Sequence, residues 1–199
     1  MTRGFLKERE GIFRLKVPFE DLYTSVFLVV TPQRLILVDC ATTEDDVELF
    51  IIPALRKMGY EPCDLDAIVI THRHGDHAGG IDAILHHAPN IEVITDAREL
   101  ADGVYTYDLH GHTKDLIGVL DMRTATLISG DGLQGMGIGK YRCSLEDRTA
   151  YLEMLERIRC DVRIENVLFS HAYEPWNKDG AFGREAVSSV INFCIEYNR

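Results

Sequence analysis

The segment ITHRHGDHAGG, residues 70–80, places three of the chain's eight histidines and one aspartate within six residues. Imidazole nitrogens and carboxylate oxygens are ligands that zinc and similar ions bind at about 2.0–2.2 Å. His72 and His74 are separated by one residue, so they can face the same way on an extended segment. Asp76 and His77 follow a glycine, where the backbone can turn toward a second position. The spacing therefore favours two adjacent metal ions over one.

Four residues of metal-ligand type each come after an apolar run that is typical of a buried strand. The runs LILVD, AIVITH, TLISGD and VLFSH end at Asp39, His72, Asp131 and His171. If these strands lie side by side and end at one edge of a sheet, their last side chains converge although they are far apart in the sequence. The pattern predicts a site assembled from several strand ends.

Periodicity indicates the elements that position these residues. Apolar and β-branched runs predict strands at residues 12–17, 25–30, 35–38, 67–70, 91–95, 125–129 and 166–170. Helical spacing predicts helices over 43–59, with an interruption at Pro53, over 81–88 and over 183–197. Ser144 and Asp147 form a capping-box pattern that predicts the start of another helix, which reaches Ile158. The order predicts an α/β protein with helices on both faces of two central sheets, the first sheet beginning as an antiparallel meander.

Composition limits the class of protein. The chain has 199 residues, of which 46% are hydrophobic, and it contains no linker or repeat, so we expect a single domain over 1–199. A net charge of −11 argues against nucleic acid as a partner and favours a small-molecule substrate. Apolar runs are too short to span a membrane, and residues 1–10 are charged, so we expect a cytoplasmic protein that does not bind membranes. The oligomeric state is not predicted.

The five cysteines form no C-x-x-C pair. An odd number of cysteines without such pairs argues against both a disulfide framework and a zinc site made of thiolates. We expect ordinary core or surface thiols.

The segment 70–80 resembles the signature of the metallo-β-lactamase superfamily of hydrolases, and the resemblance extends from about residue 12 to the C-terminus. Beyond the H-x-H-x-D-H loop, the family has an aspartate after an early strand, a histidine in Gly-His-Thr, an aspartate in Ser/Gly-Gly-Asp and a last histidine after a strand. The matching positions are Asp39 in LVDCA, His112 in HGHTKD, Asp131 in ISGDG and His171 in FSHAY. The resemblance implies a four-layer αββα sandwich of two mixed β-sheets with helices on both outer faces.

The resemblance also implies a ligand set and a cofactor. The first metal ion takes three histidines, His72, His74 and His112. The second takes Asp76, His77 and His171, and Asp131 bridges the two ions. Asp39 orients the loop without binding metal. The expected cofactor is two Zn²⁺ ions, with Fe or Mn as alternatives.

Two positions depart from the family pattern. Cys40-Ala41 stands where the family commonly has a small residue and glycine, and Lys114-Asp115 replaces the usual Pro-Gly after Gly-His-Thr. Both pairs lie beside predicted ligands. They bear on local loop shape more than on metal binding.

The expected reaction is hydrolysis of a small ester, thioester, lactone or amide by a hydroxide that two metal ions activate. Asp76 and Asp131 are the candidate catalytic carboxylates, and Asp131 can carry the proton of the water toward the leaving group. Alternatives are a mononuclear non-haem iron enzyme that resembles a persulfide dioxygenase, a phosphodiesterase, and a metal-binding module without catalysis.

The substrate pocket is less well marked. Tyr141, Tyr173 and Trp176 are candidate lining residues, and the glycine-rich segment 132–143 is expected to be a loop near the site. The segments 100–110 and 172–181 are expected to form further walls. His110 is a candidate pocket residue, and the role of Arg73 is left open.

Overall fold

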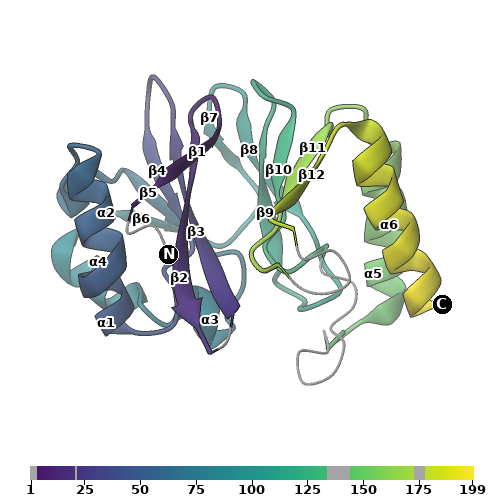
Figure 1. Cartoon of the computed structure of the whole chain (residues 1–199), viewed down its shortest axis with the longest axis horizontal. Coiled ribbons are helices and arrows are strands. Elements are labelled where there is room, and N and C mark those ends of the chain that lie inside the picture. The colour runs from purple at the N-terminus through teal and green to yellow at the C-terminus, as the bar shows by residue number, and fades with distance from the viewer. Residues whose placement is uncertain (1–3, 21, 134–143, 173–177) are drawn as a thin grey trace. The chain divides into compact units, whose positions relative to one another are not determined.

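The chain has two compact units that divide after Thr95, and each unit has its own six-stranded sheet and its own helices (Figure 1). The structure is a computed structural model, and it describes residues 4–20, 22–133, 144–172 and 178–199. Both sheets are mixed, which confirms the predicted class of two mixed β-sheets with helices. That the whole chain behaves as one domain stays a prediction.

The sheet of the first unit has its strands in chain order, β1-β2-β3-β4-β5-β6. The strand bounds are Leu6–Arg9, Ile12–Phe19, Leu22–Val30, Leu35–Val38, Ala67–Val69 and Glu92–Ile94. The first four strands are joined by short turns and pair antiparallel, as the predicted meander requires. The last three pair parallel, because helical segments connect them.

Helical segments of the first unit cover one face of this sheet. Their bounds are Glu44–Asp46 for α1, Val47–Ile51 for η1, Ile52–Lys57 for α2, Pro62–Asp64 for η2, Gly75–Ala78 for α3 and Ile81–His87 for α4. Val47, Ile51 and Leu55 pack with Leu37 and Ile68 of the sheet in a buried cluster. This periodicity explains why the segment folds as a helix against the sheet.

Where an interruption was predicted at Pro53, the helix contains a π turn just before this residue. Pro53 has no amide N–H and cannot complete the regular helical ladder. The N–H of Ile52 bonds the carbonyl of Val47, five residues earlier, so the helix passes from η1 to α2 without a break.

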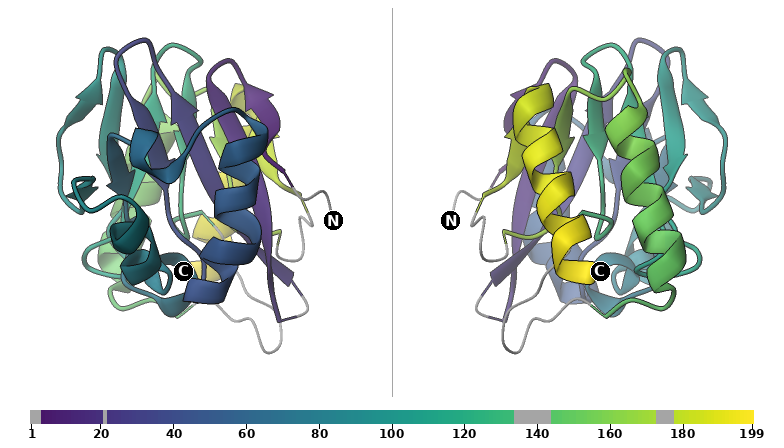
Figure 2. Two further views of the ribbon diagram at one scale, coloured as in Figure 1. Left: turned by 90° about the vertical axis from the view of Figure 1, so that its left-hand side faces the viewer. Right: turned by 90° about the vertical axis from the view of Figure 1, so that its right-hand side faces the viewer.

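The sheet of the second unit has the order β12-β11-β10-β9-β8-β7. The strand bounds are Glu99–Ala101, Val104–Asp108, Ile117–Asp121, Thr126–Ile128, Asn166–Leu168 and Gly180–Phe182 for β7 to β12. Two long helices, α5 (Arg148–Cys160) and α6 (Arg184–Asn198), lie side by side (Figure 2). Their apolar faces, including Leu155 and Ile191, pack with Leu127 and Val167.

Some local predictions were wrong. Ser144 does not cap α5; Asp147 does, because its side chain accepts a hydrogen bond from the N–H of Ala150. Much of the segment 100–110, expected as a pocket-wall loop, belongs to the antiparallel pair β7 and β8. Strands β1, β7, β8, β9 and β12 lay outside the predicted set.

Among the described residues, no helix combines the length and the hydrophobicity needed to cross a membrane.

Candidate metal-binding residues

In the first unit, two strand ends bring the expected residues together. Strands β4 and β5 are parallel neighbours with Val38 opposite Val69, so Asp39 lies beside the chain that leads to His72. The N–H of Asp39 donates to the carbonyl of Val69 at 2.9 Å, and the N–H of Thr71 donates to Oδ1 of Asp39 at 2.8 Å. These two strand ends converge as predicted, whereas the four strands of the prediction belong to two sheets and not to one.

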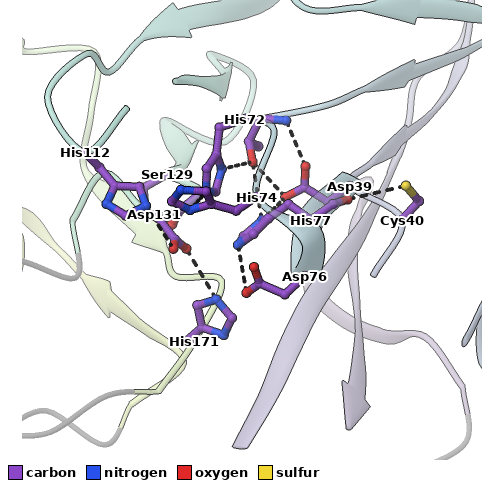
Figure 3. A network of polar contacts seen from close by, with 12 residues as sticks. Asp39, Cys40, His72, His74, Asp76, His77, His112, Ser129, Asp131 and His171 are labelled. Carbon is purple, nitrogen blue, oxygen red and sulfur yellow. Dashed lines mark hydrogen bonds and ion pairs between the residues drawn. The ribbon is translucent and has the colours of Figure 1, made fainter. Parts of the chain in front are cut away.

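Asp39 is buried and orients two of the histidines (Figure 3). Its Oδ2 lies 2.8 Å from Nδ1 of His77 and 2.9 Å from the hydroxyl of Thr71, which donates to it. The same hydroxyl oxygen lies 3.1 Å from Nδ1 of His72 and can accept its proton. Both rings therefore carry their proton on Nδ1, which leaves the lone pair of Nε2 for a metal ion.

Those Nε2 atoms face other ligand atoms. Nε2 of His77 lies 3.4 Å from Oδ2 of Asp76, and Nε2 of His72 lies 3.0 Å from Nδ1 of His74. His77 and His72 are buried, whereas His74 is exposed. When two ligand atoms bind the same tetrahedral ion at 2.0–2.2 Å, they lie about 3.4 Å from each other. Both pairs are close to that spacing.

The turn after β4 holds the metal-ligand loop by its backbone. The N–H of Cys40 donates to the carbonyl of His77 at 2.8 Å, and the thiol of Cys40 lies 3.3 Å from the same oxygen. The N–H of Gly79 donates to the carbonyl of Ala41 at 3.0 Å. A Cβ on Gly79 would lie 1.9 Å from the carbonyl oxygen of Thr42, so the contact requires glycine. Burial raises the pKa of the Cys40 thiol well above its usual range.

Ala41 has a φ of 61°, in the left-handed region that favours glycine. Alanine stands here where the family commonly has glycine, so the substitution affects the shape of the turn. The turn keeps the geometry with alanine, and its contacts with the ligand loop are made by backbone atoms.

In the second unit, two further strand ends meet. Strands β10 and β11 are parallel neighbours with Ile128 opposite Leu168, and Asp131 and His171 follow them. The N–H of Ser129 donates to the carbonyl of Leu168 at 3.0 Å, which extends the pairing toward Asp131 and His171. Nε2 of His171 lies 3.4 Å from Oδ1 of Asp131 (Figure 3).

His112 approaches the other oxygen of the same carboxylate. It lies in the loop between β8 and β9, and its Nδ1 donates to the carbonyl of Ser144 at 2.7 Å. Its Nε2 lies 3.6 Å from Oδ2 of Asp131. All three side chains of this group are buried. Asp131 thus presents one oxygen to each histidine.

The donor atoms in each unit fit a metal ion. The proton of His112 is on Nδ1, so a neutral His112 turns a lone pair toward a carboxylate oxygen, which repels it unless a cation lies between them. The separations of 3.4 and 3.6 Å exceed those of charge-assisted hydrogen bonds, which are about 2.7–2.9 Å, and are close to the spacing of two ligands on one ion. The His and Asp residues can therefore bind a metal cofactor.

The remaining predicted positions lie either outside the described residues or at the surface. Tyr141, Tyr173 and Trp176 lie outside the described residues, as does most of the loop 132–143. Arg73 is exposed, and His110 is half exposed, with Nδ1 2.7 Å from Oδ1 of Asp108.

The sequence did not reveal the residues that hold the candidate ligands in place. Thr71 connects Asp39 to His72, Ser144 orients His112 through its carbonyl, and the carboxylate of Glu146 accepts the N–H of Lys114 at 2.8 Å. Thr71 immediately precedes His72 at a strand end, which is a signal that could have identified it. The contacts of Ser144 and Glu146 join segments about 30 residues apart and have no local signature.

Comparisons with known proteins show what the chain is similar to. Residues 20–101 match the family model described as Metallo-beta-lactamase superfamily. "Beta-lactamase-like protein 2 homolog" of Drosophila melanogaster is 29% identical over 177 residues, which cover 74% of this chain and 58% of that protein. A hydroxyacylglutathione hydrolase of Vibrio cholerae is 28% identical over 198 residues, which cover 86% of this chain and 74% of the enzyme. The match thus spans about three-fifths of the length of the fly protein.

Solved structures share the fold. A metallo-β-lactamase from Erythrobacter litoralis matches with a TM-score of 0.70 and 20% identity, over 96% of each chain. The metallo-β-lactamase FIM-1 from Pseudomonas aeruginosa, in its mono-zinc form, matches with a TM-score of 0.74 and 16% identity, over 98% of this chain and 95% of that one. The chain is therefore similar to the metallo-β-lactamase superfamily over residues 20–101 and shares the fold of the solved metallo-β-lactamases.

Proposed function

We propose that the chain is a hydrolase that uses two zinc ions and a water molecule to cleave a small-molecule thioester. The observation that carries the proposal is the arrangement of Asp131, which offers one carboxylate oxygen to His112 and the other to His171. A carboxylate placed in this way suits a pair of ions better than a single ion. The sequence also suggested esters, lactones and amides, and these serve as comparison substrates.

The proposed ligand set is the one that the resemblance to the family implies. His72, His74 and His112 would hold one ion. Asp76, His77 and His171 would hold the other, and Asp131 would contact both. Iron or manganese in place of zinc would keep the same nitrogen and oxygen donors.

The ions, when bound, supply Lewis acidity that lowers the pKa of water and stabilises negative charge on a carbonyl oxygen. The residues of the chain do the remaining work. Asp131 accepts the proton of the attacking water and can pass it to the leaving group. Asp39 keeps the proton of His77 on Nδ1, so that Nε2 stays available. A thiol leaving group needs little help from a proton donor, because its pKa is about 8.5.

The thioester class is supported by the relatives. Several are named hydroxyacylglutathione hydrolase, and an acyl group on the sulfur of glutathione is a thioester. The site offers histidines and carboxylates to a carbonyl substrate of this kind. We propose a thioester as the first substrate to test.

The test is a substrate panel on protein purified without chelator. It compares a hydroxyacylglutathione thioester with a matched oxygen ester, a lactone, an amide and a nitrophenyl phosphodiester, and it records oxygen uptake with a persulfide. We expect the thioester to be cleaved with the highest kcat/KM and no oxygen uptake. Faster phosphodiester cleavage, or oxygen consumption with the persulfide, would overturn the proposal in favour of those activities.

Variants connect the activity to the site. Asp131→Ala and His74→Ala are expected to abolish thioester cleavage. His86→Ala is the matched control, because His86 is an exposed histidine on α4 outside the proposed ligand set. Equal activity in all three variants would show that the cleavage arises elsewhere.

A further inference from the structure

The loop that carries His112 is held by the segment just before α5. The N–H of Glu146 donates to the carbonyl of His112, and the N–H of Asp147 donates to the carbonyl of Gly111, both at 3.1 Å. A Cβ on Gly111 would lie 2.5 Å from Cα of Tyr151, so the loop lies directly against the first turns of the helix. The backbone of His112 is therefore fixed by residues more than 30 positions later.

The ring of His112 is oriented by the same segment. Its Nδ1 donates to the carbonyl of Ser144 at 2.7 Å. The backbone bond from Glu146 fixes the position of His112, while the bond to Ser144 fixes the rotation of the imidazole and its tautomer. The segment 144–147 thus determines where the Nε2 atom of His112 points.

Lys114 provides a third connection. Its backbone N–H donates to Oε2 of Glu146 at 2.8 Å. Proline, which is usual after Gly-His-Thr, has no N–H to donate and restricts the loop through its fixed φ. With lysine in that position, the loop has a backbone N–H and lacks the proline ring. The carboxylate of Glu146 accepts a hydrogen bond from this N–H.

We propose that Glu146 is a positioning residue that holds the loop of residues 111–114 and thereby fixes His112 for metal binding. This inference rests on the proposed function, since it assumes that His112 is a ligand. Glu146 receives the Lys114 N–H with its side chain and bonds the His112 carbonyl with its own N–H, so one residue holds both sides of the ligand. Its carboxylate restrains the loop through a hydrogen bond, whereas a proline would restrain the loop through its fixed φ.

The test measures zinc affinity by competition with a chromophoric chelator, together with the unfolding temperature of the metal-free protein. The variants are Glu146→Ala, Glu146→Gln and the double variant Lys114→Pro with Glu146→Ala. Glu153→Ala is the matched control, because Glu153 is an exposed glutamate on α5. The ¹⁵N resonance of Nδ1 of His112 serves as a further readout in the metal-free protein.

We expect Glu146→Ala to weaken zinc binding about tenfold, the lower end of what loss of a group supporting a metal ligand causes. Glu146→Gln keeps an acceptor oxygen and is expected to bind zinc almost as tightly as the unmodified chain. The double variant should recover most of the affinity that Glu146→Ala loses. The Nδ1 resonance should shift in Glu146→Ala and not in Glu153→Ala.

Equal zinc affinity in the unmodified chain and in Glu146→Ala would overturn the inference and leave the proposed function intact. Equal losses in Glu146→Ala and Glu146→Gln would also overturn it, because they would assign the effect to charge. Failure of the unmodified chain to bind any metal would instead remove the proposed function. If Lys114→Pro prevents folding, the comparison of alanine with glutamine still decides the question.

Discussion

Nδ1 of His77 lies 2.8 Å from Oδ2 of Asp39, and both side chains are almost completely buried. The same oxygen accepts the hydroxyl of Thr71, and the other oxygen accepts the N–H of Thr71. A carboxylate with three such bonds has a fixed orientation. It forces the proton of His77 onto Nδ1 and turns Nε2 toward Asp76.

Asp39→Asn is predicted to weaken metal binding at His77 by 10- to 100-fold. The amide group of asparagine can face Nδ1 with an N–H, which moves the imidazole proton to Nε2 and blocks the ligand atom. Asparagine tolerates the φ of 63° at this position, so the backbone should be preserved. Zinc competition with a chelator measures the effect. Unchanged affinity in a folded variant would show that Asp39 does not set the tautomer.

Thr71→Val is predicted to lower zinc affinity about tenfold by removing the hydroxyl that connects Asp39 to His72. Thr71→Ser keeps the hydroxyl and is the matched variant. The same chelator competition, run on both proteins, should separate them. If serine and valine lose affinity to the same extent, the loss does not follow the hydroxyl, and disturbed packing around the buried Thr71 is its cause.

Gly79→Ala is predicted to lower the free energy of unfolding of the metal-free protein by roughly 2–3 kcal/mol, because the new Cβ must displace backbone. That Cβ would lie 1.9 Å from the carbonyl oxygen of Thr42. Gly75→Ala, at the start of α3, is the control, since its Cβ would meet no atom within 4 Å. Urea unfolding of both variants measures the difference. Equal stabilities would contradict the close contact between α3 and the turn after β4.

A pH-dependent stability is predicted in the second unit. The hydrogen bond from the Arg163 side chain lowers the pKa of Asp161 from 3.8 to about 2, and Tyr107 also donates to this carboxylate. A lowered folded-state pKa stabilises the protein above the unfolded pKa, and this stabilisation is lost as the pH falls from about 4 through 2.

Asp161→Asn should therefore cost about 1 kcal/mol at pH 7, after allowance for screening of the exposed Arg163. The difference from the unmodified chain should shrink toward pH 2. Urea titrations at several pH values measure it. A difference that stays constant from pH 7 to pH 2 would show that the ionised carboxylate is not the cause.

The sequence alone predicts which candidate ligands lie close together, and it does not predict the residues that support them. Asp39, His72, Asp131 and His171 are detectable because each follows an apolar run, and parallel pairing of those strands brings them together in pairs. The polar pattern VYTYD of β8 hides its strand, because three of its five side chains are only partly buried.

Tertiary contacts decide the rest. The capping pattern at Ser144 is wrong because that residue gives its carbonyl to His112, and Asp147 begins the helix instead. Glu146 and Cys40 act through segments distant in the sequence, the loop of Lys114 and the loop of His77. Local patterns cannot reveal such partners, because nothing in either segment specifies the other.

Metal content and thioester hydrolysis, measured on the same protein, show whether bound zinc is needed for the reaction. The protein is purified without chelator, its zinc, iron and manganese are quantified, and thioester cleavage is followed before metal removal, after removal and after zinc is restored. We expect about two equivalents of zinc, loss of cleavage on removal and recovery on restoration, with no recovery in Asp131→Ala. Undiminished cleavage by protein that has been shown to contain no metal would contradict it.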